Sequence, residues 1–324
     1  MIKELQSYTA LINQAIDDLP LERSPEELYE PIRYILSLGG KRLRPVLTLL
    51  SYGLYKEDID AIIKPALAVE LFHNFTLMHD DIMDQAPLRR GQPTVHEKWN
   101  KNIGILSGDT MMVLAYELMA TAPTELKKCM DAFSKCASLV CEGQQIDMNF
   151  EKASDVTEED YLNMIGKKTA TLLGFSLELG AILAGVNDNN RKHLRQFGLN
   201  IGLGFQLKDD LLDVYGEQNK FGKQVGGDII ANKKTYLLIK ALNKASAEQK
   251  KTLENWIEAK SFDPVKKVNE VTAIYDQLCI KEFTKNLINK HFDKGYQALM
   301  QLPVSEDKKE PLKIFADYLI HRDR

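Results

Sequence analysis

Residues 24–40, SPEELYEPIRYILSLGG, contain the start, the apolar face and the end of one predicted helix. Ser24 can cap the helix, Pro25 suits its first turn and Glu27 can complete a capping box. Two glycines close the stretch, and glycine readily adopts the left-handed conformation that ends helices. The apolar residues recur at the helical period and are Leu28, Ile32, Ile35 and Leu36. The stretch therefore predicts an α-helix that ends at the glycine pair.

Helical periodicity recurs along the rest of the chain. Thr157 precedes three acidic residues and can begin another helix, and Ser305 can cap the last one. Glycine and proline are sparse, and no sustained alternation of apolar and polar residues is bounded by hairpin dipeptides. The sequence therefore predicts an all-α fold, a multi-helix bundle, with one domain over residues 1–324. Residues 216–235 interrupt the pattern with four glycines and four lysines, which predicts a functional loop.

Composition limits the class of protein. The 324 residues carry a formal net charge of −4, with 44% hydrophobic and 27% charged residues. The apolar fraction excludes a disordered chain, and the intermixed charges argue against a nucleic-acid-binding coat. The first residues lack the layout of a signal peptide, and the longest apolar run, residues 171–186, is too short for a bilayer. We therefore expect a cytoplasmic protein with no transmembrane segment and no nucleic-acid partner.

Two DDxxD clusters occupy residues 80–84 and 209–213, each inside an otherwise apolar helical stretch. On a helix, positions i and i+4 project from one face, about 6 Å apart. The first and last aspartates of each cluster therefore form a pair of carboxylates. The two repel each other unless a cation neutralises their charge. Hard carboxylate oxygens suit Mg²⁺ together with substrate phosphates. Neither cluster has the DxDxDG spacing of an EF-hand loop.

Basic residues gather in short turns along the same region. They are Lys41, Arg42, Arg44, Arg89, Arg90, Lys167, Lys168, Lys223, Lys233 and Lys234. Arginine forks and lysine point charges both bind phosphate. Two acidic clusters and several basic turns together predict a diphosphate held by Mg²⁺ on one side and by lysine and arginine on the other. The chain contains neither GxxxxGK[ST] nor GxGxxG, which disfavours nucleotide chemistry.

These motifs together resemble the trans-isoprenyl diphosphate synthase (polyprenyl synthetase) family, of the short-chain farnesyl or geranylgeranyl type. The matching segments run in order from Gly39 to about Lys234: GGKRLRP, HNFTLMHDDIMD, LRRGQPT, SGDTMM, GQQIDM, GKKTATLL, GFQLKDDLLD and GKQVGGDIIANKKTY. The resemblance implies an all-α bundle around a central cavity and a homodimer. It also implies head-to-tail condensation of isopentenyl diphosphate with an allylic diphosphate, dependent on three Mg²⁺ ions.

The family's motifs also imply a role for each matching residue. The implied Mg²⁺ ligands are Asp80, Asp84 and Asp209, supported by Asp81, Asp210 and Asp213. The implied binding groups for the allylic diphosphate are Arg89, Lys168, Lys223 and Lys233. Those for isopentenyl diphosphate are Lys41, Arg44, His73 and Arg90. Polar groups near the reacting carbons are Thr169 and Gln206.

Some implied roles are less direct. Gln144 and Asp147 can shape the cavity, whereas Arg42 stays ambiguous because the family uses the first and fourth positions of KRLR more directly. The released diphosphate is expected to remove the final proton, because no positioned side-chain base is evident in the sequence. The loop at residues 216–235 is expected to act as a lid that keeps water from the allylic cation.

Side chains before the first acidic cluster set the product length in this family. Phe75 lies five residues before Asp80, Thr76 four residues before it and Phe72 eight residues before it. An aromatic followed by a small residue resembles archaeal-type geranylgeranyl synthases, so we expect a C20 product, with C15 as the alternative. On an ideal helix Phe72 lies about 12 Å below Asp80 and nearer its face than Phe75 does. In this family the product grows down a hydrophobic tube. If Phe72 closes that tube, the shorter C15 product is favoured.

Other classes of protein share parts of this pattern. A class I terpene cyclase has the all-α fold and one DDxxD, but the intact second cluster and the GGKRLR turn argue against it. A squalene or phytoene synthase is disfavoured by the LRRGQPT turn. A non-catalytic partner subunit of a heteromeric synthase usually loses one acidic motif, and both are intact here. We therefore expect a catalytic prenyltransferase.

Overall fold

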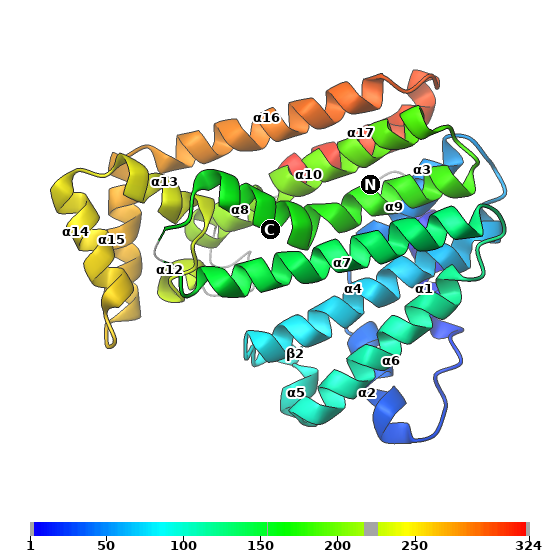
Figure 1. Cartoon of the computed structure of the whole chain (residues 1–324), viewed down its shortest axis with the longest axis horizontal. Helices are drawn as coiled ribbons and strands as arrows, with labels where there is room; N and C mark the ends of the chain where they lie inside the picture. Colours follow the sequence, from blue (N-terminus) through cyan, green and yellow to red (C-terminus); the bar gives the residue numbers. More distant parts are fainter. Residues whose placement is uncertain (1–2, 154, 217–225, 322–324) are drawn as a thin grey trace. The chain divides into compact units, whose positions relative to one another are not determined.

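A computed structural model describes residues 3–153, 155–216 and 226–321. Within these ranges the chain is almost entirely helical, and the strands are confined to a short hairpin of β1 (Leu88–Arg89) and β2 (Gln92–Pro93) (Figure 1). The first helices are α1 (Lys3–Asp17), α2 (Glu26–Ser37), α3 (Leu43–Gly53), η1 (Ile59–Ile62), α4 (Ile63–Met83), α5 (Val95–Lys98), α6 (Lys101–Met119) and α7 (Leu126–Phe150). The later helices are α8 (Glu158–Ile165), η2 (Gly166–Ala170), α9 (Thr171–Leu183), α10 (Asp188–Tyr215), α12 (Gly227–Ile230), α13 (Tyr236–Lys244), α14 (Ala247–Glu258), α15 (Pro264–Gln277), α16 (Ile280–Met300) and α17 (Glu306–His321). The all-α prediction is confirmed.

The chain packs as two compact units. Unit 1 consists of residues 1–135, 175–195 and 302–314, and unit 2 of residues 136–174, 196–301 and 315–324. The first DDxxD cluster belongs to unit 1 at the end of α4, and the second belongs to unit 2 within α10. The organisation as one domain stays a prediction.

Helix α4 is the centre of unit 1. It packs against α1, α3 and α6, and its residues from Pro65 to Phe75 are buried on nearly every side. A helix that is apolar all round is a core helix. Its last turn leaves this core, since Met83 and the C-cap Asp84 are exposed. The core of unit 1 therefore carries the first acidic cluster to the surface.

A π-helical turn, η2, is the main irregularity of unit 2. Two neighbouring helices approach its backbone at glycines. A Cβ at Gly143 of α7 would lie 2.3 Å from the backbone nitrogen of Lys168, and one at Gly202 of α10 would lie 2.6 Å from Cα of Ala170. Any larger residue at either position would push a helix away, so the glycines fix this turn against both helices. The sequence patterns did not predict the π-helical turn.

The predicted helix ends are partly confirmed. Helix α2 ends at Ser37, and Gly39 follows with φ +78°, as the glycine pair predicts. Thr157 forms the expected start of α8, in a reciprocal capping box with Asp160. The cap predicted at Ser24 is wrong. Pro25 occupies the N-cap position of α2 in an extended conformation without a side-chain cap, so Ser24 lies one residue too early for its hydroxyl to reach the free N–H groups.

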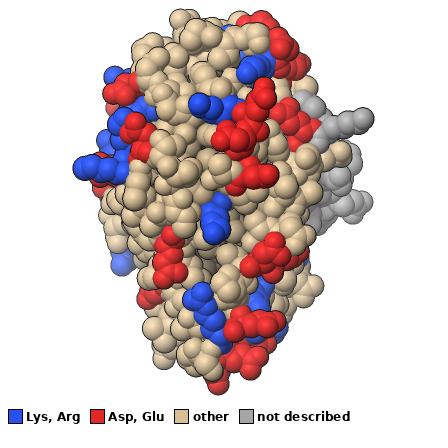
Figure 2. Space-filling view, turned by 90° about the vertical axis from the view of Figure 1, so that its right-hand side faces the viewer, with Lys and Arg blue, Asp and Glu red and all other residues tan. Residues whose placement is uncertain are grey.

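Two surface properties bear on the class of protein. Among the helices that the structure describes, none combines the length and the apolar character that a membrane span requires. Acidic and basic side chains are intermixed on the face shown in Figure 2. This mixture agrees with the charge pattern of the sequence.

Candidate active site

The last turn of α4 carries the first carboxylate pair. The backbone N–H of Asp84 donates to the carbonyl of Asp80 at 2.8 Å, so the two residues lie one helical turn apart. Asp80 is half-buried and Asp84 is exposed. The carbonyl end of a helix carries partial negative charge, which adds to that of the two carboxylates. This end of α4 therefore attracts a cation.

The middle aspartate of the cluster is already engaged. Nε of Arg89 donates to Oδ2 of Asp81 at 2.7 Å, and its Nη2 donates to Oδ1 at 2.6 Å. Asp81 is 3% exposed, so this two-pronged ion pair is shielded from water on the aspartate side. Both carboxylate oxygens of Asp81 point to the guanidinium, which agrees with a supporting rather than a ligating role.

The β1–β2 hairpin brings a second arginine onto the glycine pair. Gly40 has φ +143°, and a Cβ there would lie 2.9 Å from Nη2 of Arg90. Only glycine lets the guanidinium pack this closely on the backbone beside Lys41. Unit 1 thus brings the GGKRLR turn and Arg90 together, as the isopentenyl diphosphate assignment requires.

His73 belongs to the same basic group. Nη1 of Arg44 donates to its Nε2 at 3.0 Å. Burial, followed by the charges of Arg44 and Arg90, holds the pKa of His73 well below its usual value. The imidazole is therefore neutral at physiological pH, and it accepts from Arg44 without adding charge.

Arg42, ambiguous from the sequence, is a buried structural residue. It is 5% exposed, and its Nη1 lies 2.8 Å from Oε1 of Glu70, which is 2% exposed. The same guanidinium donates to Oδ1 of Asn13 at 3.1 Å and to the carbonyl of Leu36 at 2.9 Å. Arg42 itself adopts φ +48° at the start of α3. These bonds hold the turn on which Lys41 and Arg44 lie.

The second cluster lines a cavity in unit 2. Most of the site residues that the sequence predicts in this unit surround it, namely Lys168, Thr169, Gln206, Asp209, Asp210, Asp213 and Lys233. The other polar residues that line it are Asp147, Tyr161, Asp228, Lys234 and Thr235. Lys168 Nζ lies 2.6 Å from Oδ2 of Asp147. Lysine and aspartate groups of the predicted types therefore meet in one place.

A chain of hydrogen bonds crosses this cavity. The Thr169 hydroxyl donates to Oε1 of Gln206 at 3.1 Å, and Nε2 of Gln206 donates to Oδ1 of Asp210 at 3.1 Å. The Tyr161 hydroxyl donates to the other oxygen of Asp210. In its ionised form Asp210 only accepts, and it then fixes which end of the Gln206 amide faces Thr169.

Burial dominates the electrostatics of this chain. Asp210 is 4% exposed, and burial, followed by the charge of Asp228, raises its pKa to about 7. Burial, and then the charge of Asp210, also raises the pKa of Tyr161 well above its usual value. Tyr161 therefore remains a hydrogen-bond donor, and a nearby cation would favour the ionised form of Asp210.

Sequence reasoning missed Tyr161 and Asp228. Tyr161 lies on the buried, mostly apolar face of α8, and its hydroxyl partner lies on α10, beyond the reach of local periodicity. Asp228 follows the glycine pair of the last matching motif, and its backbone N–H donates to Oδ2 of Asp213 at 2.9 Å. That motif was the available signal for Asp228, although no role was assigned to it.

Two of the basic candidates need separate comment. Lys234 Nζ donates to the carbonyls of Phe150, at 2.6 Å, and of Ala153, so it caps the end of α7. Lys223 and part of the predicted lid, residues 217–225, lie outside the described residues. Within the described residues, no group of three or more histidine, cysteine, aspartate or glutamate side chains is placed to hold a metal ion by itself.

Comparison with known proteins identifies the family. Residues 25–277 match the model of the polyprenyl synthetase family. The chain belongs to the polyprenyl synthetase family. It is 37% identical to the geranylgeranyl diphosphate synthase of Methanosarcina mazei over 326 aligned positions, which cover 100% of this chain and 98% of the relative. It is 39% identical to the geranylgeranyl diphosphate synthase of Saccharolobus solfataricus, over 91% of this chain and 90% of the relative.

A solved structure agrees with these matches. A crystal structure of a geranylgeranyl pyrophosphate synthase has 40% sequence identity and a TM-score of 0.94, with 99% of each chain covered. The family membership confirms the resemblance drawn from the motifs and the prediction of an enzyme of the prenyltransferase class.

Aromatic side chains in unit 1 of this polyprenyl synthetase surround the predicted length-setting positions. Phe72 is fully buried, and its ring lies 5.4 Å from that of Phe133 in an edge-to-face contact. Phe75, 7% exposed, lies 5.6 Å from Phe72 and 4.8 Å from the ring of His79. The Thr76 hydroxyl donates to the carbonyl of His73 at 2.7 Å. The sequence did not indicate Phe133, because α7 supplies it from far along the chain.

Proposed function

We propose that this polyprenyl synthetase condenses isopentenyl diphosphate head-to-tail with an allylic diphosphate, and that its main product is geranylgeranyl diphosphate. The observation that carries the proposal is the cavity of unit 2, where Asp209, Lys168 and Lys233 surround the Thr169–Gln206 pair. The lysines can bind an anion and the aspartate a cation. They lie near the side-chain oxygens of Thr169 and Gln206, whose dipoles can stabilise a developing carbocation. The names of the relatives from Methanosarcina mazei and Saccharolobus solfataricus support the same product.

The donor atoms fit Mg²⁺. Asp80 and Asp84 at the end of α4, and Asp209 in the second cluster, offer only hard carboxylate oxygens, and Mg²⁺ commonly binds through one or two carboxylates plus phosphate oxygens. We propose these three residues as ligands, with three ions as the expected number. When bound, Mg²⁺ supplies positive charge that stabilises the departing diphosphate.

The chain's own groups bind and orient the substrates. We assign Lys168, Lys233 and Arg89 to the allylic diphosphate, and Lys41, Arg44, His73 and Arg90 to isopentenyl diphosphate. The oxygens of Thr169 and Gln206 would stabilise the allylic cation once the C1–O bond breaks. The double bond of isopentenyl diphosphate then forms the new C–C bond, and the released diphosphate takes the proton.

Phe75 followed by the smaller Thr76 supports C20 as the product. A shorter C15 product is the second candidate, because the fully buried Phe72 packs on Phe133 deeper in unit 1. An assay with Mg²⁺, isopentenyl diphosphate and C5, C10 and C15 allylic primers, resolved by chain length, separates the two. Arrest at C15 would support Phe72 as the residue that stops chain growth. The absence of product from every primer would favour a non-catalytic partner subunit.

We also propose a homodimer, and a cytoplasmic location stays a prediction. One side of α6 exposes large apolar residues, with Leu106 59% and Val113 57% exposed, two helical turns apart. Exposed apolar patches of this kind mark interaction surfaces. Light scattering after gel filtration should give a dimer mass for the wild type and a lower mass for Leu106→Lys. A monomeric wild type would contradict the proposal.

A further inference from the structure

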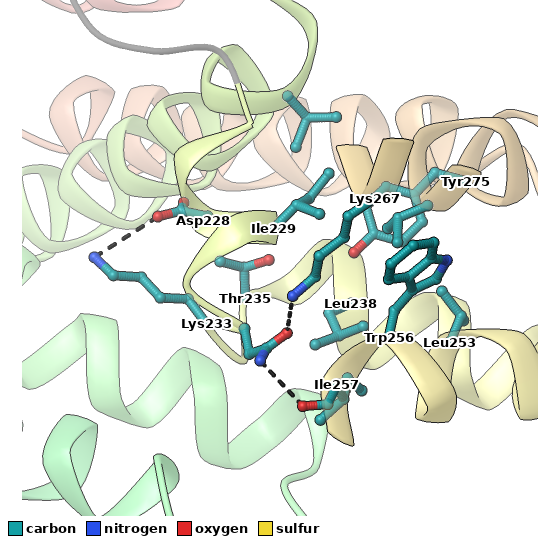
Figure 3. Close-up of a pocket in the computed structure, with 13 residues that line it drawn as sticks. Asp228, Ile229, Lys233, Thr235, Leu238, Leu253, Trp256, Ile257, Lys267 and Tyr275 are labelled. Carbon is teal, nitrogen blue, oxygen red and sulfur yellow. Dashed lines mark hydrogen bonds and ion pairs between the residues drawn. The ribbon is translucent and has the colours of Figure 1, made fainter. Parts of the chain in front are cut away.

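Lys267 of α15 is a buried lysine that no predicted role covers. The residue is 1% exposed. Its Nζ donates to Oδ1 of Asn232 at 2.5 Å and to the carbonyl of Ile230 at 3.3 Å, and it lies 4.2 Å from the centre of the Phe262 ring. Figure 3 shows Lys267 reaching from α15 past Leu238 toward the segment that leads to Lys233.

Burying an ammonium group is costly unless it gains strong partners. Here those partners are a backbone carbonyl, an amide oxygen and an aromatic ring. Lys309, which is 3% exposed, instead lies 3.0 Å from a carboxylate oxygen of Glu306. Unlike Lys309, Lys267 is held by uncharged groups. These contacts show which segment of the chain it stabilises.

That segment is the turn at the end of α12. Ile230 is the last residue of α12, so its carbonyl lies at the helix end where acceptors lack intrahelical partners. Asn232 has φ +55°, and its Nδ2 donates to the carbonyl of Ile257 at 3.1 Å. The Lys267 ammonium thus joins the end of α12 to the left-handed residue that directly precedes Lys233.

The other end of this turn is tied to the second acidic cluster. The N–H groups of Gly226 and Asp228 donate to the backbone carbonyl and to Oδ2 of Asp213, at 2.7 and 2.9 Å. Lys233 returns to the same place, because its N–H donates to the carbonyl of Asp228 at 2.9 Å and its Nζ lies 3.7 Å from Oδ1 of Asp228. Asp213 and Lys267 therefore hold the two ends of one turn, and Lys233 follows it.

We propose that Lys267 is a positioning residue for the allylic diphosphate, acting through Asn232 on the position of Lys233. This inference rests on the proposed function, since it takes Lys233 as a diphosphate-binding group. Lys267 itself has no contact with substrate in this account. Its loss should let the turn relax and weaken one charge-assisted bond to phosphate, while the isopentenyl diphosphate groups of unit 1 are unchanged.

The test is a comparison of Michaelis constants. Lys267→Met keeps the length of the buried stem and removes the ammonium. The KM for geranyl diphosphate should rise roughly tenfold, the size expected when one charge-assisted hydrogen bond is weakened, with the KM for isopentenyl diphosphate nearly unchanged. Lys309→Met is the matched control, because it removes an equally buried ammonium and should shift neither constant. Thermal melting of each variant shows whether it is folded.

Two further variants keep the inference testable. Asn232→Gly removes the amide acceptor while tolerating the positive φ, so it should reproduce the rise in KM even if Lys267→Met folds poorly. In a Lys233→Ala background, Lys267→Met should cause little further change, because its effect passes through Lys233. Equal rises in both Michaelis constants for Lys267→Met would overturn the inference. So would an undiminished rise in the KM for geranyl diphosphate when Lys267→Met is added to Lys233→Ala. A wild type that forms no product would instead overturn the proposed function.

Discussion

The buried hydroxyl of Tyr161 donates to Asp210, and Asp210 in turn accepts from the Gln206 amide at 3.1 Å. This relationship ties a residue of α8 to the second acidic cluster on α10. It makes the orientation of Gln206, and hence of Thr169, depend on a tyrosine that lies outside the family's acidic and basic motifs.

Replacing Tyr161 by phenylalanine should therefore lower turnover. Removal of one hydrogen bond to a charged acceptor should reduce kcat about tenfold, with little change in KM, because Gln206 is no longer held for the transition state. Steady-state kinetics with geranyl diphosphate measures this. Tyr296→Phe is the control, since Tyr296 also donates to an aspartate, Asp317, within unit 2 but outside the cavity lining. Unchanged kcat in Tyr161→Phe would refute the positioning role.

The proposed metal ligands predict a much larger loss. Asp80→Ala or Asp209→Ala should cut turnover by about 1,000-fold, because several kcal/mol of charge stabilisation disappear. Both variants should keep the helical circular-dichroism signal, since neither side chain belongs to a packed core. Near-normal turnover in either variant would contradict the assignment of that residue.

The aromatic side chains of unit 1 predict the direction of a change in product length. Phe75→Ala should extend the product beyond C20, because the side chain that limits the tail is gone. Chromatography of the products by chain length gives the answer. An unchanged product from Phe75→Ala, together with a longer one from Phe72→Ala, would mean that the Phe72–Phe133 contact, and not Phe75, limits the length of the product.

His291 predicts a pH dependence of stability. Burial, followed by the charges of Lys294 and Lys290, lowers its pKa from 6.5 to about 4. The folded state therefore favours the neutral ring. The contribution of His291 is complete above pH 6.5 and is lost as the pH falls toward about 4. Urea denaturation at pH 7 and pH 4.5 should show a smaller acid loss for His291→Gln than for the wild type. Equal losses would contradict this origin.

The sequence predicted what local patterns encode. The end of α2 at the glycine pair, the capping box of Thr157 and the one-turn spacing of Asp80 and Asp84 all follow from short-range rules, and the structure contains each of them. The misplaced cap at Ser24 is a one-residue error of the same local kind. Proline can take the cap position itself, so the preceding serine is left outside the helix.

Tertiary hydrogen bonds could not be predicted in this way. The pairing of Asp81 with Arg89, the burial of Arg42 beside Glu70 and the capping of α7 by Lys234 join residues from separate elements. Lys233 and Lys234 both line the cavity, and no periodicity shows that Lys234 caps α7 while Lys233 pairs with Asp228. For the same reason, local patterns did not indicate the roles of Tyr161, Asp228 and Lys267.

The central claim, a catalytic synthase of geranylgeranyl diphosphate, is tested most directly with one primer. The protein is incubated with isopentenyl diphosphate, farnesyl diphosphate and Mg²⁺, and the products are analysed by mass spectrometry with and without EDTA. The account predicts a C20 diphosphate that forms only without EDTA. Failure to extend this C15 primer, while C5 and C10 primers are extended to C15, would contradict the geranylgeranyl product, and no product from any primer would contradict the enzyme itself.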